Sequence, residues 1–495
     1  MKNMAGVGFE LKKLFRARTA AGKLKAYSYS AIVTAGPFAL LTGMVLAIQG
    51  IFMLFGVGGE ESQEFVGSVV YAFVFSQIIS CGFTMILTRY VADCLSVERY
   101  QDVTSSLFGM GAIMTAAGGI LASVFFWGKP LEFFTKLLGY LFFAQLMLVW
   151  VQSVYLSAVK KYKRLLLSYL AGALLSIGLT ALFFAGEFLP SVQGALLAMD
   201  IGMGTIVLLF FLHITAHFGL PKGGLNFAFL PYIEKHWRLL AIAMCYTAGI
   251  FIPNVIVWQG PWGVTVGGTY RYAPVYDVVT FYAFLSILPL MTLFVVSVET
   301  SFYERYQKYF AYVIRKGNFR EIDDARKDLL HTLWFEMRHI VEFQLVCTLV
   351  FLALGNYFLS WAGITYQQVN MFNVILMGVF FTGVLQVIYI LMVYFDFQQD
   401  VLKVALSFLV GNLVFGLLGL YWWGESSYGF TFFIAAAVSI VYGLSRLSHF
   451  GDRINYFVFC GQPIFYQPPN GPFTRLAKAL YGDKLVDMEK QEENR

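Results

Sequence analysis

Long apolar runs, separated by short polar gaps, fill most of the chain between residues 27 and 450. A helix that crosses a bilayer needs about 20 apolar residues, and about twelve runs of that length are present. We place them near 27–55, 65–92, 106–126, 133–158, 165–188, 192–214, 238–259, 276–298, 340–360, 369–393, 401–424 and 428–450. The pattern predicts an all-α polytopic membrane protein with about 12 transmembrane helices.

A weak internal repeat divides these runs into two halves. Thr34-Ala-Gly-Pro37 in the first run resembles Thr247-Ala-Gly249, followed by Pro253, in the seventh run. Repeats of this kind are typical of transporters, although small residues in helices also match by chance. Bends at the two prolines could let these helices move, so Pro37 and Pro253 are candidate hinges. We expect two six-helix bundles at 27–214 and 238–450, joined by a linker at 215–237.

Basic residues alternate from gap to gap along the chain. Of the 35 Lys and Arg residues, only Lys129, Lys136 and Arg271 fall in the gaps of one side. The positive-inside rule assigns the basic gaps to the cytoplasm. We therefore expect a multi-pass protein of the cytoplasmic (inner) membrane with both termini in the cytoplasm. The net charge of +6 then reflects loops that face an anionic leaflet and not a nucleic-acid site.

Three cytoplasmic segments stand out. Residues 1–26 place Val7 and Leu11 opposite Lys12 on a helical wheel, which predicts an amphipathic basic helix at the interface. The loop 299–339 continues the eighth helix, breaks at Gly317 and forms a second, charged helix. The tail 451–495 ends in a polar stretch that we expect to be disordered.

Composition excludes several classes of protein. Hydrophobic residues make up 58% of the chain and charged residues 13%, against roughly 45–50% and 25% in soluble proteins. The five cysteines show no C-x-x-C spacing, so we predict neither disulfides nor a metal site. No Walker A motif or H-E-x-x-H motif is present. We therefore predict a protein that is not an enzyme and needs no cofactor.

Charged residues inside the apolar runs are few, and each costs roughly 2.5–3.5 kcal/mol to insert. Asp200 lies within the sixth run and is a candidate proton or cation site. The alternative role for Asp200 is structural, as one half of an ion pair or as a hydrogen-bonded acid between helices. Asp277 begins the eighth run, close in sequence to Arg271.

Uncharged polar residues are more plentiful in the runs, and aromatic residues make up 18% of the chain. Amide and hydroxyl groups beside rings suit a neutral sugar chain, because sugar hydroxyls are hydrogen-bonded while the apolar sugar faces rest on rings. Polar residues also hold helices together in lipid. We predict a translocation path lined by Ser80, Thr84 and Asn254, with Arg271 and Asp277 at its outer mouth.

Several motifs resemble the PelG family, the membrane exporter subunits of the Pel exopolysaccharide system. They are Ala5-Gly-Val-Gly-Phe-Glu-Leu-Lys-Lys-Leu14, Gly36-Pro37, Pro274-Val-Tyr-Asp277, Glu299-Thr-Ser-Phe-Tyr-Glu-Arg-Tyr306 and Tyr394-Phe-Asp396. The run from Glu299 to Tyr306 is the most specific, although Ser301 stands where the family more often has an acidic residue. The resemblance covers essentially the whole chain.

This resemblance implies a MATE-like polysaccharide flippase fold, with two six-helix bundles around a central cavity. It implies a complex with a cytoplasmic glycosyltransferase and with membrane-anchored Pel subunits, one of which is a cyclic di-GMP receptor. The exported polymer would be rich in N-acetylgalactosamine and galactosamine and would cross uncharged. The expected partner contacts are Phe9, Glu10, Glu299, Tyr303, Glu304 and Arg305.

Three alternatives remain open at this point. A cation-coupled antiporter for small molecules would use Asp200 or Asp277 as its ion site. A flippase for lipid-linked oligosaccharides would differ in its cargo. A membrane scaffold would hold a synthase complex together and would have no path of its own.

Overall fold

The computed structural model of this chain describes residues 20–482, apart from 160, 222–224, 315–316, 362, 428 and 461–469. The side chains of residues 20–28, 299–300 and 425–426 are also outside the description. The sequence predictions for Phe9, Glu10 and most of the segment 1–26 therefore lie outside the described residues.

Within the described part of the chain, twelve helices are long and apolar enough to cross a membrane, which confirms the predicted number. The eighth of these spans consists of two consecutive helices, α10 and α11, that meet at Ser286. The spans are α2 (Ala20–Leu54), α3 (Gly59–Ser96), α4 (Tyr100–Phe126), α5 (Phe133–Val159), α6 (Tyr162–Ala185), α7 (Ser191–Phe218), α9 (Trp237–Gln259), α10 (Pro274–Leu285) with α11 (Ile287–Ser297), α13 (Phe319–Trp361), α14 (Tyr366–Tyr394), α15 (Gln398–Trp422) and α16 (Phe430–Asp452).

Shorter elements connect the spans. A two-stranded hairpin joins α9 to α10, and a π-helical turn joins α11 to α12. These elements are α8 (Leu230–Lys235), β1 (Val264–Val266), β2 (Tyr270–Tyr272), η1 (Val298–Phe302), α12 (Tyr303–Ile314), η2 (Gly424–Ser427), α17 (Ile454–Cys460) and α18 (Pro472–Tyr481).

The chain forms two compact units. Unit 1 comprises the described residues within Met1–Gly36, Gly249–Val264 and Tyr272–Phe465, and unit 2 those within Pro37–Ala248, Thr265–Arg271 and Tyr466–Arg495. The helices α2 and α9 each change unit part-way along their length. Both changes fall at the repeated Thr-Ala-Gly motif, directly after its Gly36 in α2 and after its Ala248 in α9.

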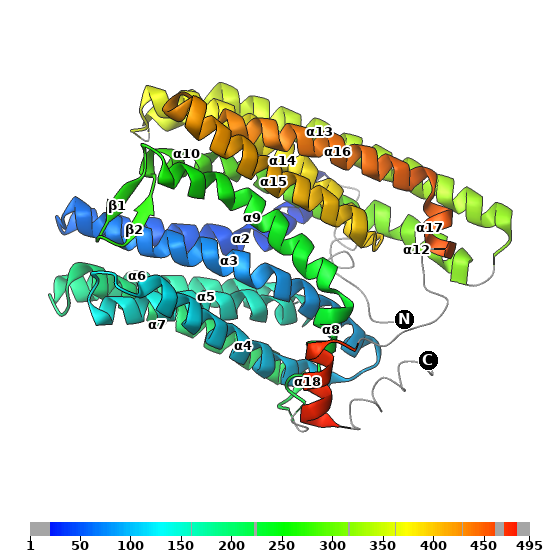
Figure 1. The fold of residues 1–495 in the computed structure, drawn as a ribbon, viewed down its shortest axis with the longest axis horizontal. Coiled ribbons are helices and arrows are strands. Elements are labelled where there is room, and N and C mark those ends of the chain that lie inside the picture. The colour runs from blue at the N-terminus through cyan, green and yellow to red at the C-terminus, as the bar shows by residue number, and fades with distance from the viewer. Residues whose placement is uncertain are drawn as a thin grey trace. The chain divides into compact units, whose positions relative to one another are not determined.

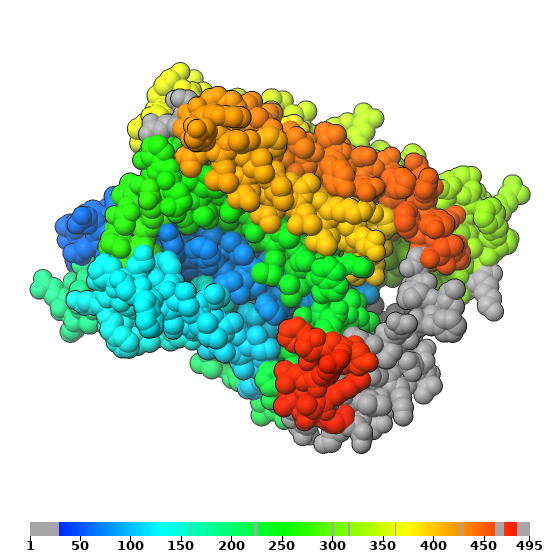
Figure 2. All heavy atoms as spheres, viewed as in Figure 1, coloured from blue at the N-terminus to red at the C-terminus, as the bar shows by residue number. Residues whose placement is uncertain are grey.

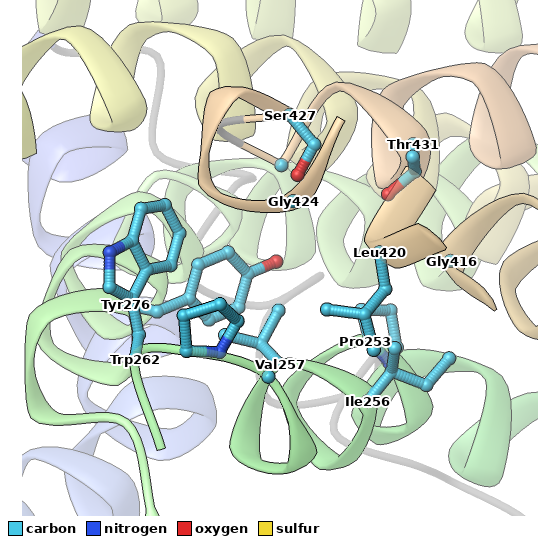
Figure 3. A pocket seen from close by; sticks show the side chains of 13 residues that line it. Pro253, Ile256, Val257, Trp262, Tyr276, Gly416, Leu420, Gly424, Ser427 and Thr431 are labelled. Carbon is cyan, nitrogen blue, oxygen red and sulfur yellow. The ribbon is translucent and has the colours of Figure 1, made fainter. Parts of the chain in front are cut away.

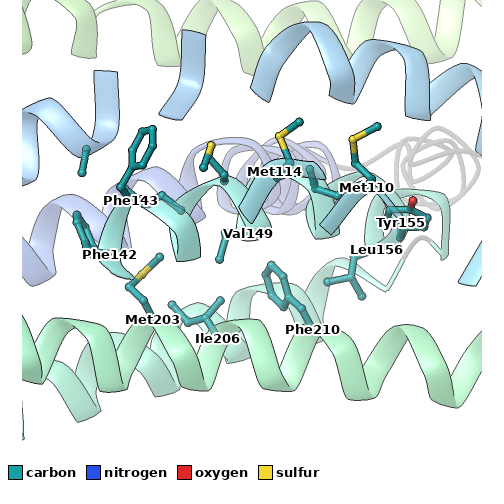
Figure 4. Packing of buried hydrophobic residues seen from close by; sticks show 14 of the residues in the cluster. Met110, Met114, Phe142, Phe143, Val149, Tyr155, Leu156, Met203, Ile206 and Phe210 are labelled. Atoms are coloured by element: carbon teal, nitrogen blue, oxygen red, sulfur yellow. The ribbon is translucent and has the colours of Figure 1, made fainter. Parts of the chain in front are cut away.

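Unit 2 is built around α5, which packs against α3, α4 and α7. Its core consists of methionine, aromatic and branched aliphatic side chains that pack between these helices, as Figure 4 shows. Met114, Met147 and Phe210 are completely buried there. Such side chains fill irregular gaps between helices, and this packing holds a membrane bundle together when lipid and side chain are equally apolar.

The helices α6 and α7 approach closely through small residues. A Cβ added at Gly172 would lie only 2.6 Å from the carbonyl oxygen of Gly202 on the neighbouring helix. Small residues at a contact let two backbones meet, as is common in membrane helices. Asp200, two residues before Gly202 on the same helix, is buried.

Unit 1 is centred on α14, which packs against α10, α13 and α16. In its most apolar window 72% of the residues are buried, against 22% for α13, so α14 is the central helix and α13 a peripheral one. Figure 1 shows α13, α14, α15 and α16 running alongside one another within this unit.

Three features differ from the sequence predictions. The charged helix of the loop 299–339 and the ninth span form one continuous helix, α13, of 43 residues. The connection at 260–275 contains the hairpin β1–β2, in which Gly267 and Gly268 both have positive φ and form the turn. In the tail, for which no helix was predicted, α18 forms from Pro472.

Candidate translocation path

The carboxylate of Asp277 joins α9 to α10. Asn254 donates to Asp277 Oδ1 at 2.7 Å, and the indole of Trp258 donates to both carboxylate oxygens at 2.9–3.0 Å. The amide of Ala273, just before α10, donates to Oδ2 at 3.1 Å. Trp258 follows Asn254 by four residues, so both donors lie on one face of α9. The predicted path residues Asn254 and Asp277 are therefore direct partners.

Pro253 lies inside α9, one residue before Asn254. Proline has no amide hydrogen, so the carbonyl of Gly249 has no helical donor at this point. Gly249 itself is required by a close approach, because a Cβ there would lie 2.6 Å from the ring of Phe408 on α15. The sequence around Pro253 thus combines a weakened helix with a tight contact.

A small pocket lies beside this joint in unit 1. It is lined by Pro253, Val257, Trp262 and Tyr276 on one side and by Ser427 and Thr431 on the other, as Figure 3 shows. Its volume is about 30 Å³. A water molecule needs roughly 10–15 Å³ measured in this way, so the pocket can hold about two waters and not a sugar ring.

A larger pocket, which we call the aromatic pocket, lies in unit 2. Its volume is about 220 Å³, and its walls come from α3, α4, α5 and β2. A cavity of about 150 Å³ already binds benzene, so a ring-sized ligand fits. Six aromatic side chains line it: Tyr71, Phe75, Phe125, Phe126, Phe143 and Tyr270.

Tyr71 is the centre of these rings. The centroid of its ring lies 5.4 Å from those of Phe125 and Tyr270 and 5.6 Å from that of Phe75. These separations are typical of aromatic pairs that stabilise each other. The aromatic pocket is therefore a packed wall of rings and not a loose collection of side chains.

The hydroxyl groups of the aromatic pocket are already hydrogen-bonded within unit 2. Ser68 donates to the hydroxyl of Tyr270 at 2.8 Å. The hydroxyl of Tyr71 donates to the carbonyl of Arg271 at 2.7 Å and accepts from its amide at 3.1 Å. Burial raises the pKa of Tyr270 to about 12, although the hydrogen bond from Ser68 opposes this change. The phenol of Tyr270 is therefore neutral at physiological pH.

The other predicted path residues lie in unit 2. Ser80 is 1% exposed, and its hydroxyl has no partner among the described residues. Thr84 donates to the carbonyl of Cys81 in its own helix at 2.9 Å. The backbone of Arg271 is held by Tyr71, beside the aromatic pocket.

Asp200 differs from Asp277 in its surroundings. It is 5% exposed, and neither carboxylate oxygen has a hydrogen-bond partner among the residues that the structure describes. The structural ion pair considered as an alternative is likewise not formed among them. Buried acceptors on two neighbouring helices, Gln145 Oε1 and Ser176 Oγ, are also unpartnered in the described part of the chain.

The predicted partner contacts that the structure describes lie on α12. Glu304 and Arg305 are exposed, and their side chains form an ion pair at 3.5 Å. Tyr303 is half-buried and accepts a hydrogen bond from Gln307 at 2.7 Å. Glu299 is part of the π-helical turn η1, and its side chain lies outside the described residues.

Two motifs that were noted separately in the sequence meet at an aromatic cluster in unit 1. Phe302 and Tyr306 pack against Tyr394 and Phe395 with ring centroids 5.4–5.8 Å apart. The neighbouring residue Asp396 has a positive φ of 58°, which turns the chain sharply after α14. Tyr309 extends this contact to α17 by donating to Asn455 at 2.9 Å. The cluster fixes where α12 leaves the bundle.

Sequence reasoning missed the aromatic pocket and the role of Trp258. The only sign of the pocket in the sequence was the high aromatic content. Aromatic residues in apolar helices are ordinarily interpreted as core or lipid-facing residues, so this content did not predict a pocket. The spacing of Asn254 and Trp258 on one face of α9 was visible in the sequence, but nothing there indicated that Asp277 would meet them.

Comparison with known protein families identifies the chain. Residues 4–459 match the model of the PelG family, which is described as "Putative exopolysaccharide Exporter (EPS-E)". The chain belongs to the PelG family. The resemblance carried by its motifs is thereby confirmed, and the family and the spans agree on a multi-pass membrane protein of the exporter class. No curated protein matches the chain.

Solved structures of MATE and related transporters share the fold of this PelG-family chain. A point mutant of the Vibrio cholerae MATE transporter VcmN is 12% identical, with 90% of this chain and 98% of that chain covered and a TM-score of 0.60. A MOP superfamily transporter from Pyrococcus furiosus is 15% identical, with 90% and 99% covered and a TM-score of 0.53. At these identities the likeness establishes the fold alone, and it confirms the predicted MATE-like class.

Proposed function

We propose that this PelG-family protein exports a neutral, Pel-like polysaccharide rich in N-acetylgalactosamine across the cytoplasmic membrane. The observation that carries the proposal is the aromatic pocket of unit 2. Of the described residues that line it none is charged, and its tyrosine hydroxyls are occupied by the protein. Such a surface offers ring faces to the apolar face of a sugar, and its described lining residues present no charged group that would bind the polymer tightly.

Movement of the polymer needs flexible points in the bundles, and Pro37 and Pro253 suit that role. Each lies inside a spanning helix. The helix of Pro37 changes unit at that proline, and α9 changes unit five residues before Pro253. A missing backbone hydrogen bond at such a point allows a helix to bend at low cost. These observations support the two prolines as hinges of the transport cycle.

A cytoplasmic glycosyltransferase, held with membrane-anchored Pel subunits that include a cyclic di-GMP receptor, would supply the polymer. The surface that we assign to the synthase is the helical pair α12 and α13. Its inner side is held by the aromatic cluster and by a hydrogen bond from Ser297 to Glu336, while Glu304 and Arg305 point outward. A rigid base with exposed charges is what a specific docking surface requires.

The path is tested by two matched substitutions in unit 2. Phe75→Ala removes a ring that lines the aromatic pocket and is 37% exposed, whereas Phe108→Ala removes a similarly exposed ring (43%) outside the pocket. Loss of about 1 kcal/mol of ring contact corresponds to roughly fivefold weaker binding. We expect Phe75→Ala to lower polymer secretion severalfold at equal protein levels, and Phe108→Ala to leave it unchanged.

Equal secretion by both variants would remove the aromatic pocket from the path. If secretion also survives bulky substitutions at Ser80 and Thr84 while the complex stays intact, the scaffold alternative replaces export. Accumulation of polyprenyl-linked repeats in a deletion strain would favour the flippase for lipid-linked oligosaccharides. These outcomes distinguish polymer export, the scaffold and the flippase for lipid-linked oligosaccharides.

The docking surface is tested by charge reversal. Glu304→Arg changes an exposed charge that belongs to a weak surface ion pair, so stability should change little. We expect the synthase to co-purify less with Glu304→Arg, and also with the double swap Glu304→Arg/Arg305→Glu, which keeps the ion pair. The control is Gln101→Arg, at an exposed position of α4 in unit 2. Unchanged co-purification in all variants would place the synthase elsewhere.

One observation favours a second candidate function, cation-coupled transport. Asp200 is a buried acid without a hydrogen-bond partner among the described residues, and it lies within a spanning helix. Such residues often carry protons or cations across membranes. Asp200→Asn tests this role: loss of secretion at normal protein levels would support ion coupling, and normal secretion would exclude it at this site.

A further inference from the structure

The helix α18 has three distinct faces. At about 100° per residue, Thr474, Ala477 and Tyr481 share one side, Phe473, Leu476 and Leu480 a second, and Arg475 and Lys478 a third. The apolar and basic sides are centred about 160° apart, with the first side roughly midway between them. The three sides therefore meet three different environments.

The first face docks α18 on unit 2. Thr474 and Ala477 are completely buried, and α18 packs on α8. The carboxylate of Glu234 in α8 accepts the amides of Gly471 and Phe473 and the hydroxyl of Thr474, which lies 2.6 Å away. At the other end, the hydroxyl of Tyr481 accepts the amide of Phe227 at 3.0 Å. Both ends of the helix are thus fixed.

The second face is left uncovered by the described part of the protein. Phe473, Leu476 and Leu480 are 42%, 51% and 53% exposed. Three large apolar side chains on one side of a short helix are costly in water, at about 25 cal/mol per Å² of exposed apolar surface. Figure 2 shows α18 in red on the outside of unit 2.

The position of α18 relative to the spans identifies what covers this face. In Figure 1, α18 runs across the direction of α3, α4 and α7 and not along it. It lies against α8, which ends two residues before the span α9 begins at Trp237. Trp237 is 53% exposed, with the guanidinium of Arg238 5.6 Å from its ring, as is common for residues at a membrane surface.

We propose that α18 lies in the plane of the membrane, with Phe473, Leu476 and Leu480 in the cytoplasmic leaflet and Arg475 and Lys478 toward its anionic headgroups and the water. A helix beside a membrane protein has a protein side, a lipid side and a water side, and the three faces of α18 match these in order. An amphipathic basic helix is the pattern that binds anionic lipid. The inference concerns how the chain's tail is anchored and does not depend on the exported substrate.

Photo-crosslinking in full-length protein tests the proposal. A benzophenone amino acid is placed at Leu480 on the apolar face or, as the matched control, at Arg475 on the basic face. The chain is reconstituted in vesicles of phosphatidylcholine and phosphatidylglycerol with alkyne-tagged acyl chains. We expect tagged lipid adducts at position 480 at several times the yield at position 475. Equal yields at both positions, or none at either, would overturn the proposal.

The same two variants in cells distinguish lipid from protein as the occupant. A lipid adduct leaves the migration of the chain nearly unchanged, whereas an adduct to another protein shifts it by the mass of that protein. A protein adduct at position 480 in cells would overturn the lipid assignment. Ala479 is exposed and lies on neither the docked nor the apolar side of α18, so a substitution there disturbs neither side.

Discussion

Two aspartates inside the spans of this chain illustrate two uses of a buried charge. Asp277 in unit 1 accepts hydrogen bonds from Asn254, Trp258 and Ala273, and so joins two helices. Asp200 in unit 2 has no hydrogen-bond partner within the described part of the chain, although it is 5% exposed. A satisfied carboxylate stabilises the fold, whereas an unsatisfied one is a cost that a fold keeps when the group does work. The comparison assigns a structural role to Asp277, whereas ion coupling stays a candidate role for Asp200.

The largest expected effect is from Asp277→Asn. The amide keeps one acceptor oxygen and places an NH₂ group against the donors at the other position, so at least one buried donor loses its acceptor. We expect unfolding to become easier by about 2–4 kcal/mol. The measurement is the thermal stability of the detergent-solubilised protein by size-exclusion fluorescence. The matched control Asp324→Asn, at an exposed position of α13, should change nothing. Equal stability of both variants would contradict the role of Asp277 in joining α9 to α10.

Trp258→Phe sharpens the assignment, because it keeps the buried ring and removes only the indole N–H. The loss in the free energy of unfolding should be smaller than for Asp277→Asn, about 1–2 kcal/mol. In the background of Asp277→Asn the same substitution should cost less, because the amide keeps only one acceptor oxygen for donors that share two in the unmodified chain. A double-mutant cycle measured by thermal unfolding gives this coupling. Additive losses would mean that the indole stabilises by packing alone.

Asp200→Asn should behave in the opposite way. Replacing an unpartnered buried carboxyl by a neutral amide removes the cost of burying the acid. We expect the melting temperature to stay the same or to rise. The gain in the free energy of unfolding should not exceed about 1 kcal/mol. A clear loss of stability would show that Asp200 has a structural partner after all, and the contrast with Asp277 would disappear.

Glu234 provides the smallest effect and extends the comparison to a carboxylate outside the spans. Its partial burial raises its pKa, but the hydroxyl of Thr474 and the amides at the start of α18 outweigh this and hold the pKa below its ordinary value of 4.5. A lowered pKa stabilises docking above the ordinary value, and this contribution is lost as pH falls through the lowered one.

Hydrogen exchange of residues 471–482 checks that prediction. Protection should be full at neutral pH and weaker at about pH 3. Glu234→Gln should show weak protection at both pH values, while Tyr481→Phe, which removes the acceptor at the other end of α18, should keep the pH dependence. Protection that does not change with pH in the unmodified chain would exclude Glu234 as the cap.

The sequence alone was sufficient for the spans, for the class of protein and for the family. Apolar runs of spanning length are enforced by the bilayer, because every backbone polar group inside it must be bonded within a helix. The alternation of basic gaps and the motif from Glu299 to Tyr306 depend only on residue order. The amphipathic continuation of the eighth helix into α12 was also visible, because helical periodicity is a local property.

Tertiary structure decided what each polar group does. Asp200 and Asp277 look alike in the sequence, and only packing shows that one meets three donors while the other meets none among the described residues. The rings of the aromatic pocket come from the consecutive helices α3, α4 and α5 and from β2, which lies far from them in the chain. The docking of α18 on Glu234 joins residues more than 230 positions apart. Such contacts depend on which helices become neighbours, and in a membrane that choice is made by close packing and not by hydrophobicity.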